Sequence, residues 1–321
     1  MIIVTGGAGF IGSNLIKALN ELGRDEIVVV DNLTNAGKSR NLSGVRILDF
    51  IDKIEFCRSL EEGAFKSKNI EIIYHQGACT DTMEYNGKYM MENNFDYSKK
   101  LLHFCLEREV PLIYASSASV YGSGKNGFTE SPESEQALNV YAYSKLLFDR
   151  YVERFLRDAK SQVVGLRYFN VFGMQENHKN HMASMVYQMF RQMQASGRIR
   201  LYEGVDGYAD GEQQRDFIYV RDVVKVNLFF ARNPQISGIF NCGTGQASTF
   251  NSLARGVLNH FKRGEIEYIA FPETLRGKYQ NHTQADTARL LAAGYDGGFM
   301  PLDDAVAEYC EFLDKNDGYL E

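Results

Sequence analysis

The sequence predicts an α/β protein with a doubly wound parallel sheet and a smaller second domain. Short apolar runs rich in β-branched residues alternate with segments of helical periodicity from Ile2 to Gly173, which is the pattern of consecutive βαβ units. The first run, Ile2 to Val4, is followed by glycines at positions 6, 7, 9 and 12 and then by an amphipathic helix. A buried strand therefore turns tightly into a helix through glycine.

This glycine-rich turn predicts a dinucleotide site of the Rossmann type. Gly7 and Gly9 lack a Cβ, so the backbone can turn sharply and approach a pyrophosphate, and Gly12 allows the helix to pack close to the strand. A second strand, 27–30, ends in Asp31, 19 residues beyond Gly12, where the acid that binds the ribose is expected. The alternative is a βα turn that binds no ligand, but this alternative does not explain why Asp31 stands at the end of the second strand.

Composition excludes several classes of protein. The 321 residues carry a net charge of −6 with both signs interspersed, which argues against nucleic acid as a partner. No run approaches the roughly 20 apolar residues of a membrane span. Five scattered cysteines (57, 79, 105, 242 and 310) form no Cys-x-x-Cys pair, so we expect neither a metal site nor a disulfide framework. With no apolar leader at the start, we expect a cytoplasmic protein.

The remaining elements are predicted from periodicity. Further strands are expected over residues 45–50, 70–74, 111–115, 163–173 and 215–220, with a short strand and turn at 238–245. Helices are expected around residues 89–102, over 141–155, 185–193, 253–261 and 302–313, and from Asp222 as an N-cap. We predict a dinucleotide-binding domain over 1–171, with a returning segment at about 216–242, and a substrate-binding domain over the remainder of 172–321.

The loop after Asp31 leaves the identity of the dinucleotide open. An acid at this position favours a free 2′-hydroxyl, as in NAD, whereas the nearby cations Lys38 and Arg40 could accommodate the 2′-phosphate of NADP. Lys38 could equally be an incidental charge in a solvated loop. Further along, Asn93 and Asn94 lie inside a predicted helix, where asparagine is mildly unfavourable; a positioning role or a surface location would each explain them.

A Tyr-x-x-x-Lys spacing with an upstream serine carries the candidate chemistry. Tyr141 and Lys145 are one helical turn apart and face the same way. A phenol titrates near 10, and a neighbouring lysine cation is expected to lower that pKa. An upstream serine hydroxyl could hold a substrate hydroxyl against the phenol. The phenolate would then accept a proton as a nicotinamide cofactor takes a hydride from the adjacent carbon. The alternative is an ordinary amphipathic helix start.

Five segments resemble the extended short-chain dehydrogenase/reductase superfamily, whose members act mostly on nucleotide sugars. The segments are 5–12 (TGGAGFIG), 116–122 (SSASVYG), 141–145 (YAYSK), 167–173 (RYFNVFG) and 215–220 (RDFIYV). The resemblance implies Ser117, Tyr141 and Lys145 as the catalytic trio. It disfavours a 4,6-dehydratase, because Ala118 and Ser119 stand where that group carries an Asp-Glu pair.

A narrower resemblance is to the family of ADP-L-glycero-D-manno-heptose 6-epimerases, which make the heptose precursor of bacterial lipopolysaccharide. It rests on residues 77–79, 87–94, 178–179, 277–280 and 283–286. The chain departs from that family in a longer loop at 205–214, and in His181 and Gln188, where a serine and a histidine are expected. The resemblance implies NADP rather than NAD, an ADP-heptose substrate and a homo-oligomer, a pentamer in that family.

The same resemblance implies a set of site residues. Those expected to contact the cofactor are Gly6, Gly9, Phe10, Ile11, Gly12, Asp31, Asn32, Lys38, Lys53, Gln76, Gly77, Ala78, Cys79, Thr80, Asn93, Lys145, Val171 and Lys179. Those expected to contact the sugar nucleotide are Ser117, Asn170, His181, Gln188, Tyr202, Glu203, Gly204, Val205, Arg215 and Tyr279. Arg215 suits a diphosphate, because a guanidinium pairs two oxygens at once.

Inversion of a carbon calls for acid/base groups on both of its faces. Lys179 is the candidate for the second base, since it follows the strand 163–173 and coincides with the second base of the resembled family. A solvated loop lysine is the alternative. The sequence therefore predicts an epimerase that oxidises a sugar carbon and returns the same hydride. Another nucleotide-sugar epimerase or reductase, or a non-catalytic dinucleotide-binding scaffold, would be the alternatives.

Overall fold

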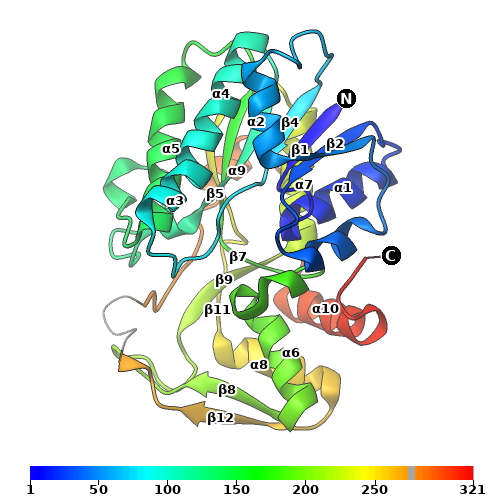
Figure 1. The fold of residues 1–321 in the computed structure, drawn as a ribbon. Coiled ribbons are helices and arrows are strands. Elements are labelled where there is room, and N and C mark those ends of the chain that lie inside the picture. The colour runs from blue at the N-terminus through cyan, green and yellow to red at the C-terminus, as the bar shows by residue number, and fades with distance from the viewer. Residues whose placement is uncertain (274–278, 321) are drawn as a thin grey trace.

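The computed structural model describes residues 1–273 and 279–320. Figure 1 shows a large sheet flanked by helices, and below it a smaller region of short strands and helices near the C-terminus. Within the described residues, none of the helices has the length and apolar character needed to cross a lipid bilayer.

The large sheet has seven parallel strands in the order β10-β6-β5-β4-β1-β2-β3. Their bounds are β1 Ile2–Thr5, β2 Ile27–Asp31, β3 Asp49–Asp52, β4 Ile72–His75, β5 Leu112–Ser117, β6 Val163–Tyr168 and β10 Gly238–Cys242. The strand order reverses between β1 and β4. In a doubly wound sheet, the crevice at the carboxyl ends of two such strands is the binding position. This architecture confirms the predicted fold class.

Helices cover both faces of the large sheet (Figure 1). One face packs against α1 (Phe10–Glu21), α7 (Val220–Arg232) and the short α9 (Ala288–Ala292) through a common apolar core. The other face packs against α2 (Lys53–Glu61), α4 (Tyr97–Arg108) and α5 (Val140–Leu156) through a second core. Strands buried on both faces explain why their sequences are continuously apolar.

The smaller region contains two further sheets. One has three strands, β7 (Asn170–Phe172), β9 (Gln214–Tyr219) and β11 (Ala247–Thr249); the other pairs β8 (Arg198–Tyr202) with β12 (Glu265–Ile269). Helices α6 (Met185–Ser196), α8 (Phe250–Phe261) and α10 (Leu302–Asn316) contribute to a third apolar core. The remaining short elements are η1 Ala36–Leu42, α3 Gly87–Met91, η2 Glu92–Asp96, η3 Ala118–Tyr121, η4 Pro132–Ser134 and η5 Asn177–Met182.

Two predicted strands are wrong in their extent. The segment 45–50 was expected to be a strand, but β3 begins at Asp49, and Val45 and Ile47 pack onto the core from a loop. Their burial produces the apolar pattern without strand geometry. The segment 163–173 is two strands, because the chain leaves the large sheet at Phe169, whose N–H donates to the Cys242 carbonyl, and β7 then pairs with β9.

Asp222 is not the N-cap of its helix. Helix α7 is capped at Tyr219, and Asp222 lies in the first turn. Its buried carboxylate instead accepts a hydrogen bond from the backbone N–H of Met300 at 2.7 Å and pairs with Lys225 at 2.8 Å. Asp222 therefore connects α7 to the distant segment at Met300 and does not cap the helix.

Candidate active site

A cavity of about 430 Å³ lies at the carboxyl ends of β1 and β4. It brings together the turn after β1, the segment after β4 and part of η5, which are far apart in the sequence. The predicted cofactor residues that line it are Gly6, Gly9, Phe10, Ile11, Gly12, Asp31, Asn32, Lys38, Lys53, Gln76, Gly77, Ala78, Cys79, Thr80, Asn93 and Lys179. Lys145 and Val171 do not line it. His181, predicted to contact the sugar nucleotide, lines this cavity instead.

The floor of the cavity is built from backbone that leaves no room for side chains. A Cβ on Gly6 would lie 2.5 Å from the backbone nitrogen of Gly77, and one on Gly12 would lie 2.2 Å from the Gly6 carbonyl oxygen. Gly6 also has a positive φ of 67°, which favours glycine. Phe10 and Ile11, at the amino terminus of α1, line the cavity. A helix N-terminus above such a cradle fits the pyrophosphate of a dinucleotide.

Asp31 and Lys38 form one unit at the end of β2. The Asp31 carboxylate accepts hydrogen bonds from the backbone N–H groups of Ala8 at 2.9 Å and Asn32 at 2.7 Å, and from the Lys38 ammonium at 2.9 Å. The Lys38 side chain is 20% exposed, so it is not the solvated loop charge that was the alternative. The site thus presents a carboxylate and an ammonium together where a ribose is expected to bind.

Sequence reasoning missed several residues that line the cavity, among them Thr34, Asn35, Tyr97 and His178. The Asn35 side chain donates to the His178 carbonyl at 3.0 Å. Nearby, the buried Asn41 donates to the carbonyls of Ala8 and Gln175 at 2.9 and 3.2 Å. These contacts join η1 to the segment leading into η5 across more than a hundred residues. No local pattern in the sequence could have indicated them.

Ser117 and Tyr141 lie together as predicted, beside the cavity but outside its lining. Ser117 ends β5, and its hydroxyl is near enough to Tyr141, in the first turn of α5, to lower the pKa of the phenol. The Ser117 oxygen also accepts hydrogen bonds from the backbone N–H and hydroxyl of Ser119, at 3.2 and 2.9 Å. Cys79, which lines the cavity, is close enough to Tyr141 and Lys145 to influence both electrostatically.

The expected lowering of the Tyr141 pKa is not found. Burial raises the pKa of Tyr141, and the hydrogen bond from Ser117 only partly opposes that rise. Lys145 is buried and donates to the carbonyl of Ala115 at 2.9 Å. Burial also lowers the pKa of Lys145 to about 8, although the carboxylate of Asp149 acts in the opposite direction. Burial is therefore the largest influence on the pKa of both groups; it outweighs the hydrogen bond from Ser117 at Tyr141 and the Asp149 carboxylate at Lys145.

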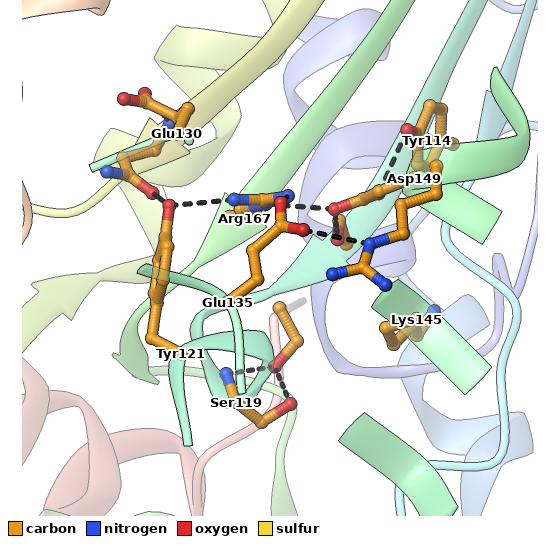
Figure 2. A network of polar contacts seen from close by, with 12 residues as sticks. Tyr114, Ser119, Tyr121, Glu130, Glu135, Lys145, Asp149 and Arg167 are labelled. Carbon is orange, nitrogen blue, oxygen red and sulfur yellow. Dashed lines mark hydrogen bonds and ion pairs between the residues drawn. The ribbon is translucent and has the colours of Figure 1, made fainter. Parts of the chain in front are cut away.

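A buried polar network fixes the helix that carries Tyr141 and Lys145 (Figure 2). Asp149, one turn beyond Lys145, accepts hydrogen bonds from Tyr114 at 2.9 Å, from Ser116 at 2.8 Å and from Arg167 at 2.9 Å. Arg167 also contacts Glu135 and Tyr121. The network connects α5 to β5 and β6, and so sets the distance between Ser117 and Tyr141.

The two neighbouring asparagines lie in a stretch of π-helix. Asn93 and Asn94 lie in η2, a π-helical stretch between α3 and α4, and such stretches are frequent at functional sites. The Asn94 side chain is buried and exchanges two hydrogen bonds with the backbone of Cys79, at 2.8 and 2.9 Å. Asn93 lines the cavity and accepts a hydrogen bond from Lys53. Asn94 is therefore a positioning residue and not a surface asparagine.

Lys179 lies between two cavities. It lines the large cavity and a neighbouring one of about 270 Å³, which also contains Asn170 and Val171. Its ammonium lies 5.1 Å from the ring centroid of Phe10, within range of a cation–π interaction. Burial lowers the pKa of Lys179, and the Glu176 carboxylate opposes that shift. Lys179 is thus not a freely solvated loop lysine.

The other predicted substrate residues are divided between two places. Gln188, Tyr202 and Tyr279 line a cavity of about 200 Å³, which shares Met185 and Phe250 with the 270 Å³ cavity. Arg215 is buried, with its guanidinium 4.8 Å from the ring centroid of Tyr279. Glu203, Gly204 and Val205 lie in the loop after β8 and line none of these cavities. Gly277 and Lys278 of the 277–280 motif lie outside the described residues.

This site belongs to a known class of dinucleotide-dependent enzyme. A model of the NAD dependent epimerase/dehydratase family matches residues 2–243, and the chain belongs to that family. It is 54% identical over 322 aligned positions to the ADP-L-glycero-D-manno-heptose-6-epimerase of Brachyspira hyodysenteriae, covering 100% of both chains. It is also 54% identical over 311 positions, 97% of each chain, to the protein of that name from Alkalilimnicola ehrlichii.

Solved structures agree with these sequence relatives. The crystal structure of the Helicobacter pylori ADP-L-glycero-D-manno-heptose-6-epimerase has a TM-score of 0.84 and 31% identity, with 98% of this chain and 96% of that chain covered. UDP-glucose 4-epimerase from Thermus thermophilus, solved in complex with NAD, has a TM-score of 0.80 and 25% identity, with coverage of 98% and 99%. The relatives thus identify the chain as an epimerase, and the solved structures share its fold.

Proposed function

We propose that this protein interconverts ADP-D-glycero-D-manno-heptose and ADP-L-glycero-D-manno-heptose at C6″ of the heptose. The observation that carries the proposal is the position of Lys179, between the cavity with the glycine cradle and the cavity lined by Asn170. The names of the relatives support the choice of sugar nucleotide. In a bacterial cell this reaction would supply heptose for the lipopolysaccharide core.

The first half of the reaction needs a base at the C6″ hydroxyl. When bound, the nicotinamide cofactor accepts a hydride from C6″ and later returns it. Tyr141 takes the hydroxyl proton as its phenolate, and Ser117 donates a hydrogen bond to the same oxygen. Because burial raises the pKa of Tyr141, the phenolate requires a positive charge nearby, which Lys145 can supply one helical turn away.

The second half needs a proton on the opposite face. In the opposite epimer the C6″ oxygen would lie on the far side of the carbon from Tyr141, so Tyr141 could not protonate it. Lys179 delivers the proton there as an ammonium, and in the reverse direction accepts it as an amine. Burial lowers the pKa of Lys179, which increases the share of the neutral amine at a given pH and so favours its action as a base in the reverse direction.

Conversion of the substrate tests the proposal directly. Proton NMR of ADP-heptose incubated with the protein should show the signals of the second C6″ epimer growing to a constant ratio. UDP-glucose and UDP-N-acetylglucosamine are the controls, because structures of epimerases named for those substrates also match the fold. Epimerisation of either control sugar without conversion of ADP-heptose would identify the alternative, another nucleotide-sugar epimerase.

We propose NADP as the cofactor, with NAD less favoured. The resemblance to heptose epimerases and the ammonium of Lys38 beside Asp31 support this choice, since a cation can accommodate a 2′-phosphate. Nucleotide released by heating the purified protein should chromatograph as NADP. Lys38→Ala should weaken NADP binding more than NAD binding. Recovery of NAD alone would overturn the choice.

An epimerase returns the hydride that it takes. The absorbance of the reduced nicotinamide should therefore stay constant during turnover, apart from a small amplitude for bound intermediate. A steady rise with the sugar nucleotide would instead indicate a dehydrogenase. The homo-oligomeric state, the domain boundary at residue 171 and the cytoplasmic location stay predictions; sedimentation would test the first of these.

A further inference from the structure

Glu176 is a fully buried carboxylate that the proposed chemistry does not use. It lies in the segment between β7 and η5 and is 0% exposed. Its oxygens accept hydrogen bonds from the backbone N–H of Ser184 at 2.5 Å, from the Ser184 hydroxyl at 2.6 Å and from the Tyr309 hydroxyl at 3.0 Å. A buried carboxylate with several donors is costly to assemble, so a function for it is worth seeking.

The contacts of Glu176 fix the two ends of the segment that carries Lys179. Ser184 is the N-cap of α6, so Glu176 connects the start of this segment to the start of that helix. Tyr309 belongs to α10, so its hydrogen bond connects that helix to the same carboxylate. The Glu176 carbonyl also accepts the backbone N–H of Lys179 at 2.9 Å. The backbone of Lys179 is therefore fixed to the backbone of Glu176 within one turn.

Glu176 is the acidic group of this segment that acts electrostatically on Lys179. Burial raises the pKa of Glu176, and Lys179 together with the hydrogen bonds from Ser184 and Tyr309 opposes that rise. Burial lowers the pKa of Lys179, and the Glu176 carboxylate raises it. His178 is held neutral, because burial lowers its pKa to about 4. Tyr309 is held protonated, because burial raises its pKa. His181, Lys38 and Asp31 also line the large cavity, and Lys38 is already paired with Asp31 at 2.9 Å.

We propose that Glu176 is a positioning residue for Lys179: it fixes the turn that places the lysine between the two cavities, and its charge sets the balance between the amine and the ammonium. The consequence for turnover rests on the proposed function. The effect on Lys179 itself does not, and it can be measured without any substrate.

Competitive labelling of Lys179 tests the electrostatic part. Acetic anhydride acylates the neutral amine, so labelling as a function of pH, followed by mass spectrometry of the Lys179 peptide, gives the titration midpoint of this lysine. Glu176→Gln retains the size of the side chain and removes its charge. We expect the midpoint to fall by about one pH unit, because an ammonium without its counterion is harder to form. An unchanged midpoint in folded Glu176→Gln protein would overturn the proposal.

Two further variants separate charge from structure. Tyr309→Phe removes a hydrogen bond to Glu176 but keeps the charge, so its midpoint should stay near that of the parent. Glu176→Asp also keeps the charge but has a shorter reach; its midpoint should be retained while turnover falls. If Glu176→Gln does not fold, Glu176→Asp tests the positioning role instead. Turnover of Glu176→Asp at the parent's rate would contradict that role.

Kinetics on ADP-heptose tests the positioning part. Glu176→Gln should lower kcat about tenfold or more and change KM less than about twofold, because the substrate contacts are elsewhere. Glu311→Gln is the matched control, since this exposed residue of α10 pairs with Lys315 at the surface; it should behave as the parent. A parent protein inactive on ADP-heptose would refute the proposed function, and the labelling midpoints would still decide the role of Glu176.

Discussion

At the scale of single residues, burial determines the acid/base properties of the site. Lys145 and Lys179 both have lowered pKa values because burial disfavours the ammonium, and each has a carboxylate nearby that opposes the shift: Asp149 for Lys145 and Glu176 for Lys179. Both lysines therefore combine a partly desolvated amine with a counterion in a hydrogen-bonded network. At Lys145 the result is a pKa of about 8, and at Lys179 the pKa is likewise lowered; a lowered pKa suits a lysine that takes part in proton transfer.

Removing either proposed acid/base group should stop epimerisation. Tyr141→Phe and Lys179→Met should each reduce the rate by at least about a hundredfold, while circular dichroism and bound dinucleotide stay as in the parent. Hydride transfer on one face should survive in each variant, which a C6″ aldehyde analogue would reveal as one-sided oxidation or reduction. Lys179→Met protein that epimerises at the parent's rate would show that Tyr141 serves both faces.

Ser119 should contribute through Ser117. Its hydroxyl donates to the Ser117 oxygen at 2.9 Å, which leaves the Ser117 proton available for Tyr141 or the substrate. Ser119→Ala should lower kcat about fivefold, the effect of one neutral hydrogen bond of roughly 1 kcal/mol. Ser119→Thr retains the hydroxyl and should recover most of that rate. Equal rates for the two variants would contradict this role.

At the scale of elements, the sequence predicts what is local and misses what depends on distant contacts. The turn after β1, the strand end at Asp31 and helix α5 are predictable because each follows from periodicity and glycine placement within a short segment. The start of β3 was misplaced because Val45 and Ile47 pack, partly buried, against the core from a loop. Strand β8 was missed although Arg198 to Leu201 alternates exposed and buried residues, a signal that could have been used.

The site shows the same division. The glycine cradle and the pairing of Ser117 with Tyr141 follow from motifs. The contacts of Asn41 with Gln175, of Tyr309 with Glu176 and of Asp149 with Arg167 join residues that no local pattern relates. Glu203, Gly204 and Val205 were assigned by resemblance, and they do not line the described cavities.

The network beneath α5 should be important for stability. Asp149→Asn removes the charge that pairs with buried Arg167, and breaking a buried pair costs about 3–5 kcal/mol. Ser116→Ala removes one of the hydrogen bonds to Asp149 and should cost about 1 kcal/mol. Urea denaturation of both variants measures the difference. Similar free energies of unfolding for the two would mean that the ion pair adds little to the network.

At the scale of the whole molecule, buried neutral histidines should make stability depend on pH. Burial lowers the pKa of His75 to about 3 and that of His178 to about 4, from an ordinary value of 6.5. Below pH 6.5 the unfolded chain therefore binds protons that the folded chain does not, so the free energy of unfolding falls as the pH decreases towards 4.

Each of these histidines should lower the free energy of unfolding by about 1 kcal/mol as the pH falls from 7 to 5.5. Urea denaturation at the two pH values measures the loss. His75→Gln should be less stable than the parent at pH 7, because His75 contacts Thr5 and Ser98 at 2.6 and 2.8 Å, but it should lose less stability on acidification. An identical pH dependence in parent and variant would exclude His75 as the cause.

The chain leaves the large sheet after β6, forms β7 and β9 in the small sheet, and returns to pair β10 with β6. A protein truncated after residue 171 would therefore lose the outermost strand of its large sheet, and the unpaired edge of β6 would invite aggregation. Recombination with a related enzyme faces the same difficulty, since a single crossover point cannot exchange the substrate-side region intact. New specificity in this scaffold has to come from point substitutions in loops or from multi-segment grafts that leave residues 238–242 in place.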